Sequence, residues 1–307
     1  MFHPIDKEIA IRETDFSGIF FVCILCFCKT EVIYMYRGYN LDLSKKENQD
    51  FFNVSDHELA MYDKKVEELK KNLNSKIDET ILLPRTKENR VDGSRLVDDW
   101  FPGYKADVFV SHSHNDIRTA KRLACWLERE FKLSTFIDST VWGNANKLLE
   151  KIDKKYSIMR TNKDGSITYS YSTRNYTTSH VHMMLSTALN DVIFSTECII
   201  FLNTPESLKI NEVEEKKTVS PWIYNELKTA SIVEKNYPRA KKIKERIEKR
   251  YLQHDFSASN QLEIEYDVRK QLAIFENLDA NKLKQWENKY MEYQESYHPL
   301  DVLYENI

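Results

Sequence analysis

Three short apolar runs, each followed by a polar segment, most constrain what this chain can fold into. The runs ADVFVSHS (106–113), STFID (134–138) and CIIFLN (198–203) have the β-branched and aromatic content of buried strands. Helical periodicity follows the first run in IRTAKRLACWLEREF (117–131) and the third in PWIYNELKTASIV (221–233). Because strands alternate with helices, we predict an α/β fold in which helices cover both faces of a parallel sheet.

The polar segments after these runs are the predicted ligand-binding positions. In open parallel sheets, ligands bind beyond the carboxyl ends of the strands, where the strand order reverses. We therefore expect a site among Ser111–Asp116, Asp138–Gly143 and Asn203–Ser207.

Glycine scarcity and charge balance exclude several classes of function. Only six of the 307 residues are glycine, whereas average usage is about 7%. No two of them have the spacing of a Rossmann dinucleotide loop or a Walker A loop, so both motifs are excluded. Lys and Arg number 45 and Asp and Glu 48, a net charge of −3. This balance argues against a nucleic-acid partner held through phosphate contacts.

Residues 1–34 are predicted to lie outside the fold. They contain Ile19–Cys28, an apolar run of ten residues, which is shorter than the roughly 20 needed to span a bilayer. Acidic residues precede the run and no cleavage site follows it, unlike a signal peptide. We interpret 1–34 as a leader or a misassigned start, with translation beginning at Met35, and expect a cytoplasmic protein without membrane contact.

Residues 35–103 are predicted to form a helical N-terminal extension. An apolar stripe at helical spacing runs through 55–77, and Ser55 and Glu58 have capping-box spacing at its start. A polar connection follows over roughly 84–103.

The main domain is predicted to span 104–235, with a Tyr- and Thr-rich insertion near 156–180. The charged region 236–307 is predicted to be helical and to complete the sheet. Within it, QLEIEYDV (261–268) alternates like a strand, and a helix is predicted to begin at Asp279.

Two pairs of histidines suggest a metal site as one alternative. His112 and His114 follow the first strand as H-x-H, and His180 and His182 repeat the pattern. Imidazole pairs of this kind bind catalytic metals in metallohydrolases. However, no Asp or His series follows the later strands, so a polar loop with Asp116 capping the next helix is the favoured interpretation.

Two further candidates lie after the second and third strands. Trp222 and Glu226 stand four residues apart, which places them on one helix face. An aromatic ring beside a carboxylate suits a sugar-containing ligand, although a core Trp beside a solvated Glu is the plainer alternative. Trp142 and Gly143, in the predicted loop after the second strand, are a candidate ligand or partner surface.

Taken in order, these pieces resemble Toll/interleukin-1 receptor (TIR) domains, which have a flavodoxin-like parallel sheet. ADVFVSHSHND resembles the first strand and loop of the family, and STFIDS resembles the second strand running into its BB loop. CIIFLNTPES and SPWIYNEL resemble the third strand and the S-x-W-x-x-x-E-L helix. The resemblance covers roughly 104–235. A fourth strand is missing at the usual distance after Val233, and residues 261–268 are the candidate to supply it.

The resemblance implies a bacterial enzyme that cleaves NAD at the nicotinamide–ribose bond, as in Thoeris-like antiphage defence. By this resemblance NAD is a substrate, and neither a cofactor nor a metal is needed. The TIR domains would self-associate, and a separate effector could respond to the product. The implied catalytic residue is Glu226; the implied NAD-binding residues are Ser111, His112, Ser113, His114, Asp138, Ser139 and Trp222, with Trp142 and Gly143 in an assembly loop.

Two rival functions remain open at this point. A TIR domain without catalysis would serve as a self-association module, with Glu226 as a surface residue. An H-x-H metallohydrolase is the third possibility.

Overall fold

The computed structural model describes residues 37–44, 48, 50–79, 83–101, 103, 105–137, 139–210, 216–233, 264–293 and 297–306. The predictions for 1–34, for the part of the charged C-terminal region over 236–263 and for Asp138 lie outside these residues.

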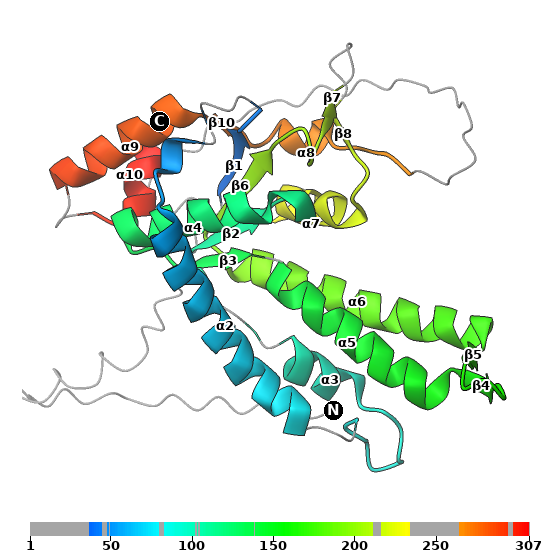
Figure 1. The fold of residues 1–307 in the computed structure, drawn as a ribbon. Coiled ribbons are helices and arrows are strands. Elements are labelled where there is room, and N and C mark those ends of the chain that lie inside the picture. The colour runs from blue at the N-terminus through cyan, green and yellow to red at the C-terminus, as the bar shows by residue number, and fades with distance from the viewer. Residues whose placement is uncertain are drawn as a thin grey trace, which may run out of the picture. The chain divides into compact units, whose positions relative to one another are not determined.

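A five-stranded parallel sheet forms the centre of the fold (Figure 1). Its spatial order is β10-β1-β6-β2-β3, and every neighbouring pair is parallel. The three strands expected from the sequence are confirmed as β2, β3 and β6. The strands are β1 (Arg37–Asp42), β2 (Val108–Ser111), β3 (Thr135–Ile137), β6 (Cys198–Asn203) and β10 (Glu276–Leu278).

Helices and two small antiparallel sheets surround this sheet. The α-helices are α2 (Asp56–Glu79), α3 (Gly93–Trp100), α4 (Ile117–Phe131), α5 (Ser139–Tyr156), α6 (Tyr171–Ser195), α7 (Pro221–Ile232), α8 (Arg269–Leu272), α9 (Ala280–Tyr293) and α10 (Pro299–Asn306). The short 3-10 helices are η1 (Asp50–Phe52) and η2 (His114–Asp116). The remaining strands are β4 (Ile158–Thr161), β5 (Ile167–Tyr169), β7 (Lys209–Ile210), β8 (Lys216–Thr218) and β9 (Tyr266–Asp267).

Both faces of the sheet are buried, which confirms the predicted α/β architecture. Alternate residues of β6 enter opposite cores, because successive side chains of a strand point to opposite faces. Ile200 and Leu202 pack in one core with α4, α9 and α10. Ile199 and Phe201 pack in the other with α5, α6, α7 and α8.

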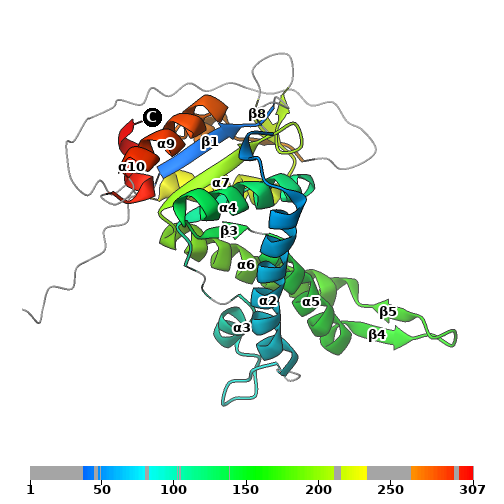
Figure 2. The same ribbon diagram turned by 60° about the vertical axis from the view of Figure 1, so that its left-hand side comes forward.

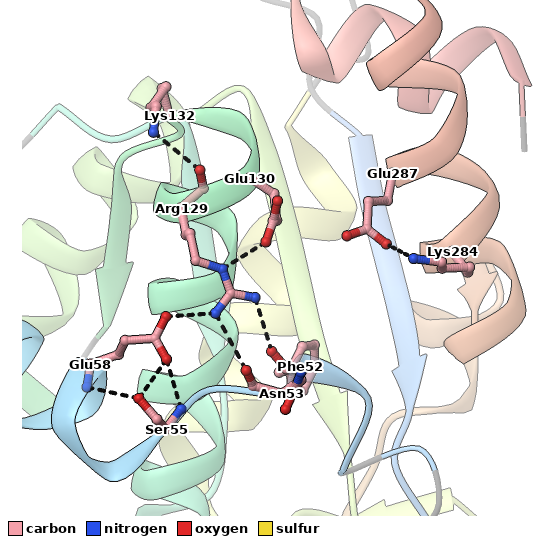
Figure 3. A network of polar contacts seen from close by, with 9 residues as sticks. All are labelled: Phe52, Asn53, Ser55, Glu58, Arg129, Glu130, Lys132, Lys284 and Glu287. Carbon is pink, nitrogen blue, oxygen red and sulfur yellow. Dashed lines mark hydrogen bonds and ion pairs between the residues drawn. The ribbon is translucent and has the colours of Figure 1, made fainter.

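Helix α2 confirms the helix predicted over 55–77, including its start (Figure 3). The backbone N–H of Ser55 donates to Glu58 Oε2 at 2.8 Å, and the N–H of Glu58 donates back to Ser55 Oγ at 3.2 Å. These reciprocal bonds are a capping box, which satisfies backbone donors that the first helical turn leaves open.

The segment 35–103, expected to be a helical N-terminal extension, also contributes a central strand that the sequence-based prediction did not include. β1 lies between β6 and β10, and its Tyr39 and Leu41 are fully buried. Gly38 lets the Phe275 ring approach closely, since a Cβ at this position would lie 2.8 Å from that ring. The sequence RGYNLD gives little strand signal, because only two of its six residues are large and apolar.

The C-terminal region completes the sheet, but not through the residues expected. β9, within the predicted strand 261–268, pairs with β8 in a separate three-stranded sheet. Instead, the short strand β10 pairs with β1 in parallel. The helix predicted from Asp279 is confirmed as α9, and the Asp279 side chain accepts a hydrogen bond from Lys282 N at 2.9 Å.

Two segments expected to be loops are partly helical. The polar connection over 84–103 contains α3, whose Leu96 and Trp100 are buried and whose first turn is capped by Asp92. The segment after β3 is helical from Ser139, because α5 starts there. The loop predictions for these two segments are therefore wrong in part.

The insertion near 156–180 forms the far end of a helical arm. Helices α5 and α6 lie side by side, and β4 and β5 join them as an antiparallel hairpin (Figures 1 and 2). The Tyr- and Thr-rich stretch is therefore the hairpin's second strand and the beginning of α6.

Candidate functional site

A buried hydroxyl–carboxylate pair lies at the carboxyl end of β2. Ser111, the last residue of β2, donates from Oγ to Oε2 of Glu226 at 2.6 Å. Both side chains are buried, with Glu226 only 1% exposed. The predicted first-strand loop and the predicted S-x-W-x-x-x-E-L helix thus meet at one point. Glu226 is therefore neither the solvated carboxylate of the plainer alternative nor the surface residue expected for a non-catalytic module.

Local sequence explains how α7 presents Glu226. Ser220 is the N-cap, and its side chain accepts a hydrogen bond from Ile223 N at 3.2 Å. Pro221 occupies the first helical position, where a missing N–H costs nothing. Because the helix begins at this position, Glu226, one turn after Trp222, faces the sheet.

Trp222 has a different neighbour from Glu226. Its ring meets His182 of α6 edge to face, with ring centroids 5.7 Å apart. Trp222 is half-buried against the second core, whereas His182 is exposed. The two residues share a helix side, but Trp222 contacts the arm while Glu226 contacts the sheet.

The loop after β2 points its two histidines in different directions. His112 is buried, and its Nδ1 lies 3.2 Å from the Val110 carbonyl oxygen. Ser113 is half-buried and His114 is exposed in η2. Within the part of the chain that the structure describes, no three His, Cys, Asp or Glu side chains gather as metal ligands would.

Asp116 occupies the N-cap position of α4, as predicted, but its side chain does not cap the helix. Instead, Asp116 Oδ2 accepts a hydrogen bond from Thr204 Oγ1 at 2.5 Å. Burial raises the pKa of Asp116, and the Thr204 bond partly opposes that rise. Beside it, Asn115 Nδ2 donates to Glu206 Oε2 at 2.7 Å. Two of the three predicted ligand-binding segments are therefore joined directly.

The third predicted segment is Asp138–Gly143, and the structure describes only part of it. Asp138 lies outside the described residues. Ser139, Trp142 and Gly143 belong to the helical backbone of α5, and their side chains are outside the described part.

Three asparagines lie near this edge, and only Asn203 belongs to a segment that was predicted from the sequence to bind a ligand. Asn203 ends β6, and Asn40 Nδ2 in β1 donates to Asn277 Oδ1 in β10 at 3.2 Å. Asn203 carried a signal, as a polar residue closing an apolar run. Asn40 and Asn277 carried none, because neither of their strands was recognised.

Comparison of the chain with models of known protein families, with curated proteins and with solved structures gave no match. None of the helices in the described ranges combines the length and apolar character needed to cross a bilayer.

Proposed function

We propose that this protein cleaves the nicotinamide–ribose bond of NAD, as a TIR-type glycohydrolase or cyclase. The observation that carries the proposal is the bond between Ser111 Oγ and Glu226 Oε2. It brings the helix motif that resembles the catalytic motif of enzymatic TIR domains to the carboxyl end of β2. That edge is where open parallel sheets bind ligands.

The strand order supports a TIR-like arrangement. Flavodoxin-like sheets have the order 2-1-3-4-5. Here β3, β2 and β6 occupy the first three positions with the matching connections, while β1 and β10 occupy the fourth and fifth. In this proposal the N-terminal strand stands in for the fourth strand that is missing after Val233.

The chemistry requires little beyond a positioned carboxylate. When the ribose C1′–N bond breaks, the electron pair leaves with neutral nicotinamide, and positive charge develops on the ribose as in glycoside hydrolysis. The Glu226 carboxylate would stabilise that charge. Water adding at C1′ would give ADP-ribose and a proton, whereas an adenine nitrogen would give a cyclic product. Either product could signal to a separate effector in antiphage defence.

Nicotinamide release from NAD by the purified protein tests this function. Glu226→Gln keeps the side-chain shape and removes the charge, so the rate should fall by roughly 10²–10³, as when a preorganised electrostatic group is lost. Glu197→Gln is the matched control, because Glu197 precedes β6 at the opposite end of the sheet. Wild-type rates with and without a chelator separate this proposal from metal-dependent hydrolysis. Equal rates of nicotinamide release by Glu226→Gln and the wild type would contradict the enzymatic proposal.

A non-catalytic self-association module is the second candidate, and the arm favours it. The end of the arm exposes the large side chains of Met159, Tyr171 and Tyr176, and Tyr171 is 82% exposed. Exposed apolar groups concentrated in one place are typical of interaction surfaces. If the module is the function, Met159→Ser with Tyr171→Ser should convert an oligomer to a monomer in analytical ultracentrifugation, and no variant should cleave NAD.

A further inference from the structure

Ser111, Asn40 and Asn277 lie in one register row of the sheet, with Phe201 of β6 between Ser111 and Asn40. In β1, Tyr39 and Leu41 enter the first core, so Asn40 between them faces the α7 side of the sheet. The register pairs Phe201 of β6 with Ser111 on one side and with Asn40 on the other. Asn277 then pairs with Asn40.

Asn203 lies nearer the carboxyl edge of the sheet than this row and faces the same side. It is two residues beyond Phe201, which packs in the second core. It is followed by Thr204 and the exposed Pro205 and Glu206, so it stands at the rim of the sheet. Glu226 approaches the same face from α7 through its bond to Ser111.

Two amide oxygens on this face of the sheet are buried without a hydrogen-bond partner among the described residues. One is Oδ1 of Asn40, a residue that is 4% exposed. The other is Oδ1 of Asn203, a residue that is 7% exposed. In this arrangement Asn40 Nδ2 donates to Asn277 Oδ1, which leaves Oδ1 of Asn40 as the acceptor without a partner among the described residues. Buried polar groups in native proteins are nearly always hydrogen-bonded, and exceptions require an explanation.

We propose that Asn40 and Asn203 form a subsite that accepts hydrogen bonds from the hydroxyl groups of a sugar. Both atoms are acceptors, and Glu226, bonded to Ser111 on the same face of the sheet, adds carboxylate oxygens, so the fitting ligand is rich in donors. An anionic group such as phosphate would meet oxygen atoms and a carboxylate, and is disfavoured there. Under the proposed function, on which the ligand's identity rests, the sugar is a ribose of NAD.

Asn203→Leu tests the subsite, because it keeps the side chain's approximate shape and removes the acceptor. Without a ligand, the variant should be at least as resistant to urea as the wild type, since it removes a buried amide oxygen that has no partner among the described residues. The KM for NAD should rise by about fivefold to tenfold, the effect of losing one hydrogen bond to a neutral group. The affinity for ADP-ribose, measured by calorimetry, should fall by the same factor.

Thr135→Val is the matched control. Thr135 Oγ1 is also buried without a partner among the described residues, but it lies in β3 beside Val108, at the amino end of the sheet. This variant should leave the KM for NAD and the affinity for ADP-ribose unchanged. If Asn203→Leu fails to fold, Asn203→Ala takes its place with the same expected loss of affinity.

The outcomes separate this subsite from the proposed function. If the wild type cleaves NAD and Asn203→Leu has an unchanged KM and ADP-ribose affinity, the subsite is overturned and the function stands. If the wild type neither cleaves NAD nor binds ADP-ribose, the proposed function fails, and ribose 5-phosphate becomes the probe. A rise in melting temperature with ribose 5-phosphate that inorganic phosphate does not give, and that Asn203→Leu loses, supports a sugar subsite. No such rise overturns it.

Discussion

At the scale of single residues, the Ser111–Glu226 pair has a structural role as well as a proposed chemical one. Glu226 is buried and receives its hydrogen bond from Ser111. Removing the donor leaves a buried carboxylate oxygen with one bond fewer. We therefore predict that Ser111→Ala lowers the free energy of unfolding by about 1–3 kcal/mol. Urea unfolding followed by circular dichroism measures this change.

Ser113→Ala is the control for that prediction. Ser113 is only half-buried, and as the N-cap of η2 it makes no side-chain capping bond. Its replacement should change the free energy of unfolding by no more than about 0.5 kcal/mol, as for ordinary surface positions. An equal loss in both variants would show that the Ser111–Glu226 bond adds no specific stability.

Glu197 predicts a pH dependence of stability. Burial, together with the charges of Asp301 and Asp107, raises the pKa of Glu197 from 4.5 to about 7. Because the folded protein holds this proton more tightly than the unfolded chain, the group stabilises the fold fully below pH 4.5. That stabilisation falls as the pH rises and is lost near pH 7.

Glu197→Gln should remove this contribution. Between pH 4.5 and pH 7, the free energy of unfolding of the wild type should fall relative to that of the variant. Urea titrations of both proteins at several pH values in this range measure the two free energies of unfolding. Their difference reports on Glu197, because the other titrating groups contribute equally to both proteins. Parallel curves for the two proteins would contradict the raised pKa.

At the scale of elements, α2 is fixed by its capping box and by Arg129 of α4 (Figure 3). Arg129 Nη1 donates to Glu58 Oε1 at 2.8 Å, so Glu58 joins the cap of α2 to α4. The bonds from Ser55 and Arg129 hold the pKa of Glu58 at about 2. The ionised carboxylate therefore stabilises the fold above about pH 4.5, and this stabilisation is lost as the pH falls towards 2.

Ser55→Ala should lower the free energy of unfolding by about 1 kcal/mol at pH 7, the usual cost of losing a Ser N-cap. The loss should be smaller at pH 2, where half of the Glu58 carboxyl groups are protonated. Chemical denaturation at the two pH values measures this, with Ser44→Ala as a control at an exposed position outside the helix. A loss of the same size at both pH values would show that the carboxylate takes no part in the cap.

Elements with strong local patterns could be predicted from the sequence, whereas elements defined by distant pairing could not. CIIFLN became β6 with the expected bounds, and the apolar positions of α4 are buried as expected. β1 and β10 contain few large apolar residues, and they pair with each other although Asn40 and Asn277 are 237 residues apart in the sequence. Local periodicity carries no information about such a pairing.

The residues of the candidate site likewise divide into those that local sequence could predict and those that it could not. Ser111 was placed at the end of a predicted strand and Glu226 on a predicted helix, but the bond between them was not predicted. Asn40 could not be predicted, because its position depends on the register between β1 and β6. The direction of the His112 side chain likewise depends on packing that the sequence does not display.

At the scale of the whole molecule, the central sheet combines β1, from early in the sequence, with β10, from late in the sequence. We therefore predict that removing β1 disrupts the fold. β1 lies between β6 and β10, and it buries Tyr39 and Leu41 against α10 and its neighbours. A chain of residues 44–307 would lack this strand and leave two facing edges without a partner. We expect it to lose the cooperative urea transition and to expose apolar surface. A chain of residues 104–235, the part that resembles a TIR domain, would also lack β10 and should behave in the same way.

A chain of residues 35–307 is the matched control, because it keeps β1 and every later element. It should unfold with the same midpoint and the same dependence on urea as the full chain. Circular dichroism and dye binding on the four chains measure these outcomes together. A cooperative transition in the 44–307 chain would show that β6 and β10 can close the sheet without β1. A loss of stability in the 35–307 chain would show that residues 1–34 contribute to the fold.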